Sequence, residues 1–205
     1  NFKYFFELKP TPCAINFNEP IGAWDTSNVN NMSAMFYDAK SFNQYIGDWD
    51  TSKVENMSSM FYMGDNSIFN GDISRWNTSN VKNMSYMFSG ATSFNQDIST
   101  KNISAKDSPT GIKYTAWDTS NVKNMDSMFL YSEFNKDISN WNTSNVKNMS
   151  YMFSHSIFNK DISNWDIRKV NDMSSMFNMS NIDENYKPTK PAPATTTSST
   201  PAPTT

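Results

Sequence analysis

The sequence predicts an α/β solenoid of about six coils, each a short strand, a turn and a short helix, followed by an extended Thr/Pro-rich tail. Three observations predict this class. The six tryptophans each open a version of one phrase, W-[DN]-T-S-N-V-x-N-M-S-x-M-F, and positions 76–89 and 141–154 are identical. Two methionines in each of the six copies account for twelve of the fourteen in the chain. A second phrase, F-N-x-x-I, leads from one copy to the next tryptophan. Repeats of this length are typical of a stack in which each copy contacts its neighbours.

Each part of the unit predicts one element. In N-M-S-x-M-F the apolar residues at i, i+3 and i+4 predict a short helix, and the asparagine, as at Asn83, is a good N-cap. The stretch F-N-x-D-I-S-x-W is rich in β-branched and aromatic residues and predicts a short extended segment. The link D/N-T-S-N predicts a turn. The recurring asparagines predict side-chain hydrogen bonds from coil to coil.

A single unit cannot bury its tryptophan, phenylalanines and methionines by itself. Each fully buried large side chain contributes roughly 1.5–3 kcal/mol, which offsets the ordering entropy only if neighbouring coils share their faces. Three segments follow from this pattern: residues 1–14 as an N-terminal cap or assembly segment, 15–186 as the repeats, and 187–205 as the tail. The pattern departs from regularity at 100–116, where the interval from Trp76 to Trp117 stretches to 41 residues, and after Phe177, where no F-N phrase follows.

The phrase FNxDISxWNTSNVKNMSxMF resembles the repeat of the BspA-like leucine-rich-repeat surface proteins, in the variant of about 25 residues found in bacterial surface lipoproteins and some protist proteins. The resemblance covers approximately residues 15–180. It implies a leucine-rich-repeat-like solenoid outside the cell or on its surface, with a role in adhesion or surface structure. It carries over no catalytic residue.

Composition excludes several other functions. The formal net charge is −3 and the 17 lysines and arginines are scattered among 20 acids, so no basic surface for nucleic acid is evident. No apolar run approaches the roughly 20 residues of a membrane helix. Cys13 is the one cysteine and cannot form an internal disulfide.

No constellation of base, nucleophile and orienting group stands out, so we expect no enzyme and no cofactor. The chain begins with Asn1 and ends inside a Thr/Pro tract, which predicts a processed or partial product.

One histidine and two rows of polar residues each allow a chemical and a structural interpretation. His155 is the one histidine, and we interpret it as a surface or turn residue. Asp72, Asp97, Asp137 and Asp161 form a row that could bind calcium, but calcium sites need closely spaced carboxylates and glycines, so turn capping is favoured. The row of one threonine per coil suggests an ice-binding surface as one interpretation. The row breaks at Ile167, which argues against ice binding.

Glycosylation is the stronger signal. Eight asparagines lie in N-x-[ST] sequons. Four of them occupy the helix-capping position, where a sugar would not fit: Asn31, Asn56, Asn83 and Asn148. Asn77 and Asn142 occupy a position that aspartate fills in other copies, and Asn178 follows the last copy. Asn102 lies in the insertion, outside the repeat, and is the best candidate.

The tail has almost no apolar residue larger than alanine, and its composition resembles mucin-like O-glycosylated stalks, with a plain linker as the alternative. The candidate O-glycosylation sites are Thr189, Thr195, Thr196, Thr197, Ser198, Ser199, Thr200, Thr204 and Thr205.

The two ends of an open stack expose its core unless caps cover it. The N-terminal segment carries Phe2, Tyr4, Phe5, Phe6 and Leu8, which predict either a cap over the first coil or a contact with Phe177 and Met179 on the last coil of another molecule. The second arrangement does not close and generates a fibre. We therefore expect a secreted, glycosylated, non-enzymatic structural protein that self-associates head to tail in an extracellular fibril or surface layer. The alternative is an adhesin that binds a host or matrix protein or glycan through the solenoid face or the 100–116 insertion.

Overall fold

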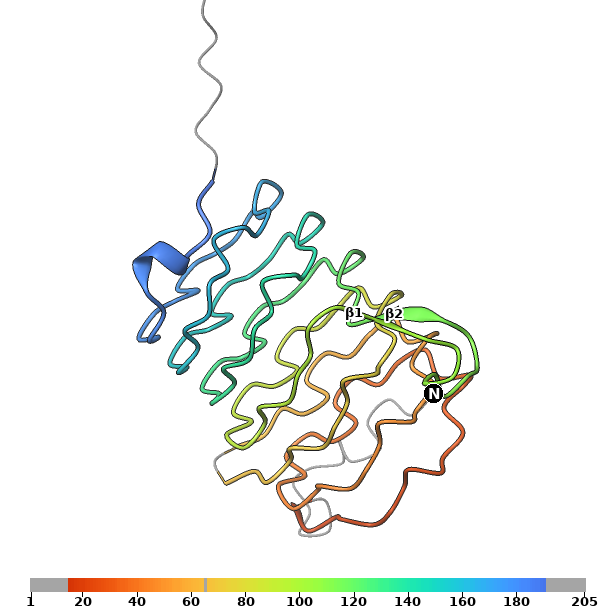
Figure 1. Ribbon diagram of the computed structural model, residues 1–205. Coiled ribbons are helices and arrows are strands. Elements are labelled where there is room, and N and C mark those ends of the chain that lie inside the picture. The colour runs from red at the N-terminus through yellow and green to blue at the C-terminus, as the bar shows by residue number, and fades with distance from the viewer. Residues whose placement is uncertain (1–14, 65, 191–205) are drawn as a thin grey trace, which may run out of the picture.

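The computed structural model describes residues 15–64 and 66–190, which wind into coils stacked in chain order (Figure 1). We number the coils 1 to 6 by their tryptophans: Trp24, Trp49, Trp76, Trp117, Trp141 and Trp165. Equivalent residues of neighbouring coils form parallel bridges, from Asn31 with Asn56 to Asn148 with Asp172. Each coil therefore lies directly on the next.

The N-M-S-x-M-F segments form turns instead of the expected short helices. In coil 3 the middle residue, Tyr86, is left-handed with φ 57°. The Phe88 amide donates to the Met128 carbonyl of the next coil at 2.9 Å, whereas the Met87 amide donates to Met84 in its own turn at 3.2 Å. An α-helix bonds each amide to the fourth residue back, and it cannot form where every second amide is used by the neighbouring coil. We call these stretches the ladder segments.

The F-N-x-D-I segments are not strands either. In the described ranges the strands are β1 (Lys101–Ile103) and β2 (Tyr114–Ala116), both in the insertion, and the helix is a single 3₁₀ turn, η1 (Glu184–Tyr186). The amide of the phrase's asparagine is accepted by a side chain of the previous coil, as in Asn70 N to Asn43 Oδ1 at 2.9 Å. This side-chain ladder, which the asparagines predicted, replaces the main-chain bonds of a sheet.

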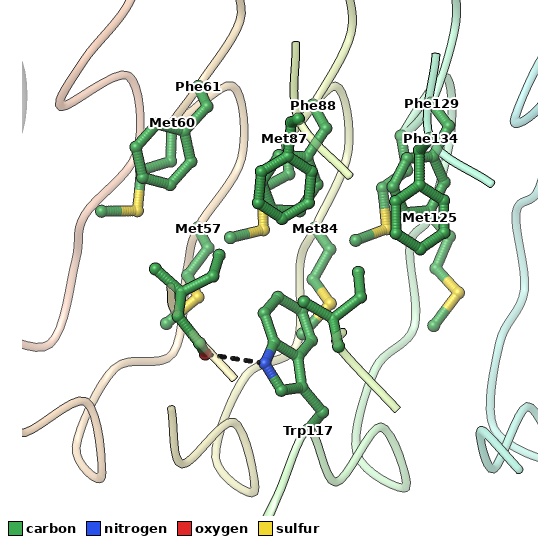
Figure 2. Close-up of a cluster of buried hydrophobic side chains, with 14 of the residues drawn as sticks. Met57, Met60, Phe61, Met84, Met87, Phe88, Trp117, Met125, Phe129 and Phe134 are labelled. Carbon is green, nitrogen blue, oxygen red and sulfur yellow. Dashed lines mark hydrogen bonds between the residues drawn. The ribbon is translucent and has the colours of Figure 1, made fainter. Parts of the chain in front are cut away.

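The core consists of columns of equivalent side chains (Figure 2). The rings of Phe61 and Phe129 lie above and below Phe88, each with its centroid 5.7 Å away. The Trp117 indole donates to the Ile73 carbonyl of the preceding coil at 3.0 Å. Because each coil covers the apolar side of the next, these rings are fully buried.

The insertion forms a hairpin that folds back toward earlier coils. Strands β1 and β2 pair antiparallel, with Asn102 opposite Thr115. The Tyr114 hydroxyl donates to the Arg75 carbonyl, and Arg75 Nη1 donates to the Asp107 carbonyl at 3.1 Å. The loop side of the hairpin is therefore attached to Arg75, directly before the tryptophan of coil 3.

A partial seventh phrase follows Phe177, where the sequence showed none. Ile182 is buried, and the Asp183 amide continues the asparagine ladder by donating to Asn159 Oδ1 at 3.0 Å. Lys190 Nζ donates to the Val170 carbonyl at 3.1 Å. Residues 182–190 thus cover part of coil 6. The sequence pattern does not show this phrase, because Ile182 stands in place of its phenylalanine and Asp183 in place of its asparagine.

The expected N-terminal segment, with Phe2, Tyr4, Phe5, Phe6 and Leu8, lies outside the described residues, and so does the tail from residue 191. The divisions at 14/15 and 186/187 stay predictions.

Candidate functional site

The ladder segments and the two residues that follow each of them carry large aromatic side chains on their outer side. Tyr37, Tyr86, Tyr131 and Tyr151 are between 36% and 55% exposed, and Tyr62 is half-buried. Tyr86 and Tyr151 directly precede the buried methionines Met87 and Met152 in the sequence. Both tyrosines have a left-handed backbone, and the chain there alternates between inward and outward side chains, so the tyrosines point outward. We call these five tyrosines the tyrosine face.

Contacts between coils order the tyrosine face. Tyr37 and Tyr62 stack with centroids 4.8 Å apart, and Tyr86 follows at 6.2 Å from Tyr62. Farther along, Tyr131 stacks on His155 at 4.6 Å. Burial, followed by the neighbouring Tyr62 and Asp38, raises the pKa of Tyr37 above its usual value.

Three lysines of consecutive coils each directly precede a ladder segment. Lys82, Lys123 and Lys147 occupy one position of the repeat, four residues before Tyr86 and Tyr151 in coils 3 and 5, and all three are exposed. Main-chain bonds align them, with the Lys123 amide donating to Lys82 and the Lys147 amide to Lys123, both at 2.9 Å. Lys82 pairs with Glu55 at 2.7 Å. Among the described residues, the ammonium groups of Lys123 and Lys147 have no ion-pair partner.

Sequence reasoning missed both rows. The tyrosines occupy the variable positions of the phrase, so they did not form a visible pattern. The lysines were counted as scattered charges, although the recurrent V-K-N of coils 3, 4 and 5 is a signal that places them on one line once the coils are aligned.

The sequon asparagines are not brought together. Asn102 is exposed in β1, where its Oδ1 accepts a hydrogen bond from the Thr115 hydroxyl at 3.1 Å. Asn142 and Asn178 are exposed, whereas Asn77 is half-buried and its Oδ1 accepts bonds from the Ser79 amide and hydroxyl.

Of the tail residues singled out for O-glycosylation, Thr189 is described and exposed. The others lie beyond the described part: Thr195, Thr196, Thr197, Ser198, Ser199, Thr200, Thr204 and Thr205.

The aspartate row caps turns. Asp161 Oδ1 accepts the amide of Ser163 at 2.9 Å, and Asp72, Asp97 and Asp137 accept the equivalent bond in their coils. Hydrogen bonds from the Ser163 hydroxyl and amide lower the pKa of Asp161. In the part of the chain that the structure describes, no group of three or more His, Cys, Asp or Glu side chains is placed to hold a metal ion.

The threonine row is buried and not available to a ligand. Thr143 Oγ1 donates to the Asp166 carbonyl of the next coil at 3.0 Å, and the threonines of coils 1 to 4 make the same bond. In the described part of the chain no complete coil follows coil 6 to supply that carbonyl, which accounts for Ile167 in this position. The break in the row thus has a packing reason.

The ladder segment of coil 6 forms an open edge. Its amides at Met173, Ser175, Phe177 and Met179 have no hydrogen-bond partner among the described residues, whereas the equivalent amides of coil 5 all donate to coil 6. Met179 is 72% exposed. Phe177 stacks on Phe153 at 6.1 Å and lies beneath the Lys187 ammonium, 5.3 Å from its ring centroid.

The described residues include no helix long and apolar enough to cross a membrane. Comparison with curated proteins and with solved structures finds no match. One family model matches nearly the whole chain, over residues 2–114 and 105–187. Its description assigns no function, so the likeness to BspA-like surface proteins stays a resemblance. The chain belongs to the family described as Mycoplasma protein of unknown function, DUF285.

Proposed function

We propose that this protein is a non-enzymatic, leucine-rich-repeat-like solenoid of the cell exterior whose tyrosine face binds a macromolecular partner. One observation carries the proposal: Tyr37, Tyr86, Tyr131 and Tyr151 are exposed on coils whose phenylalanines are fully buried. Clustered exposed aromatic side chains mark interaction sites, because they combine a large apolar contact area with a polar group. The extracellular location rests on the resemblance to surface repeat proteins.

The tyrosine face is favoured over the insertion as the binding site. The insertion's aromatic residue, Tyr114, is half-buried and its hydroxyl is bonded to the Arg75 carbonyl. Burial raises the pKa of Tyr114. This side chain holds the hairpin in place, so it is not free to contact a partner.

The proposed function is tested by adhesion of the full chain to cells and extracellular matrix. The double variant Tyr86→Ser/Tyr151→Ser should reduce adhesion at least tenfold, since central aromatic residues carry about 2 kcal/mol or more each at interfaces. The matched control is Ile112→Ser, which removes an apolar side chain that is 68% exposed at the tip of the insertion. Unchanged adhesion in the tyrosine variant, or equal loss in the control, would contradict the proposal.

A structural role in a head-to-tail fibril is the second candidate, and the open edge of coil 6 favours it. Its four amides, which find no acceptor within residues 15–64 and 66–190, repeat the donor pattern with which each earlier coil meets the next. Unpaired edges of this kind are templates for another chain. Light scattering across a range of concentrations should show growth that Met179→Asp abolishes, and a monodisperse monomer at all concentrations would exclude the fibril.

Attached glycans remain part of the proposal. Exposure favours Asn102, Asn142 and Asn178 over Asn77, and Thr189 for O-linked sugar. Intact mass before and after deglycosylation tests this.

A further inference from the structure

We infer that the tyrosine face binds a linear polysaccharide that carries anionic groups, with sugar rings on the tyrosines and the anions at Lys123 and Lys147. The inference rests on the proposed function and adds the chemistry of the partner.

The first argument is periodicity. Equivalent residues of adjacent coils are joined by parallel main-chain bonds of 2.9 Å, as at Lys82, Lys123 and Lys147. Parallel-bonded segments lie about 4.8 Å apart, so Tyr86 and Tyr151, two coils apart, present rings at a spacing of about 10 Å. Tyr86 and Tyr151 share one repeat position, with Ser127 between them in coil 4, and the three lysines share another. Two aligned pairs of this kind are matched by a ligand that repeats along its length.

The second argument is the chemistry of the contacts. A pyranose ring has an apolar face of C–H groups, which packs on an aromatic ring, and hydroxyls at its edge, which pair with phenol and amide groups. The tyrosine face offers both, because its rings are exposed and each ring carries a phenol hydroxyl.

The ladder amides argue against an extended peptide as the ligand. Peptides that add to an exposed backbone edge depend on free main-chain donors and acceptors. In coils 1 to 5 the ladder amides already donate to the next coil, as Phe88 does to Met128 and Phe153 to Met176. A peptide lying across the tyrosine face would find no such partner there.

The third argument is charge. Lys123 and Lys147 are exposed, adjacent and without an ion-pair partner among the described residues. Two carboxylates lie near them in the repeat, Asp126 and Asp172, and neither forms an ion pair with a lysine among the described residues. Asp126 instead accepts hydrogen bonds from the hydroxyls of Ser150 at 2.6 Å and Ser127 at 3.3 Å. The whole chain carries a net charge of −3, so it has no general attraction for polyanions, and binding to one would identify a local site.

Binding of the full chain to immobilised heparin, with size-matched neutral dextran as the second surface, tests the inference. We expect saturable binding to heparin that Tyr86→Ser/Tyr151→Ser abolishes and that Lys123→Gln/Lys147→Gln weakens roughly tenfold. The matched control is Lys136→Gln/Lys160→Gln, which makes the same charge change on consecutive coils outside the ladder segments and should leave binding unchanged. Raising the salt concentration should weaken binding to heparin.

Each outcome decides between alternatives. Equal loss in both lysine pairs would show attraction without a site and overturn the inference, and so would equal binding to dextran and heparin. If neither surface binds the chain while cell adhesion still requires Tyr86 and Tyr151, the partner is a protein; the inference then fails and the proposed function survives. Loss of tyrosine-dependent adhesion after enzymatic removal of acidic glycans from the cells supports the inference, and persistence contradicts it.

Discussion

Exchanging valine and threonine at one repeat position should have opposite effects in coils 5 and 6. In coil 5, Thr143 is buried and its hydroxyl donates to the Asp166 carbonyl at 3.0 Å. Thr143→Val keeps the shape of the side chain but leaves that carbonyl without the donor. The loss of a buried hydrogen bond costs about 1–3 kcal/mol when one partner stays unsatisfied.

In coil 6 the same position holds Ile167, which is buried although residues 15–64 and 66–190 contain no complete coil after coil 6. Ile167→Val should cost about 0.5–1.5 kcal/mol for the lost methylene. Ile167→Thr should cost about 1–3 kcal/mol more than Ile167→Val, because the described residues include no following coil whose carbonyl would accept the hydroxyl as Asp166 does for Thr143. The protein should therefore be more stable with threonine than with valine at position 143, and less stable with threonine than with valine at position 167.

Urea unfolding followed by tryptophan fluorescence measures the four free energies, and unchanged m-values confirm that the unfolding reaction is the same in each variant. If replacing valine by threonine changes the free energy of unfolding in the same direction at both positions, the hydroxyl does not act between coils. The explanation given for the threonine row is then wrong.

Three further predictions concern pH, the insertion and glycosylation. The folded pKa of Asp161 is depressed below its ordinary value of 3.8, so its stabilising contribution is present above that pH and is lost as pH falls below it through the folded pKa; thermal midpoints should fall on acidification, and less so in Asp161→Asn, which keeps the turn-capping acceptor. Arg75→Ala removes the bond to the Asp107 carbonyl and should speed tryptic cleavage within 104–113 while changing global stability by less than about 1 kcal/mol, whereas Arg168→Ala, outside the insertion, should leave cleavage unchanged. In a eukaryotic secretory host, mass spectrometry should find sugar at Asn102 and none in Asn102→Gln at that site.

The repeat and its core could be predicted from the sequence because they depend on residue spacing alone. Aligning the tryptophans places Met84, Met87 and Phe88 in equivalent positions, and all three are fully buried. Their backbone could not be predicted in the same way. The spacing i, i+3, i+4 fits a helix and also the observed alternating turn, and what decides between them is the carbonyl of a neighbouring coil, such as Met128, which accepts the Phe88 amide.

The candidate site was hidden for a related reason. The residues that distinguish one coil from another, such as Tyr86 and Ser127 at one position, vary along the chain and drop out of any consensus phrase. Only stacking shows that the variable positions share one outer face. Ile167 illustrates the converse, since the break it makes in the threonine row is explained by the end of the stack and by no property of coil 6 alone.

Amide hydrogen exchange measured by NMR on the monomer tests the stacking most directly. The ladder amides of inner coils, such as Phe88, donate to the next coil, whereas those of Met173, Ser175, Phe177 and Met179 have no coil to donate to. We predict that Phe88 exchanges on the order of 10³-fold more slowly than these four. Equal exchange rates in coils 3 and 6 would contradict the claim that each coil is held by the next.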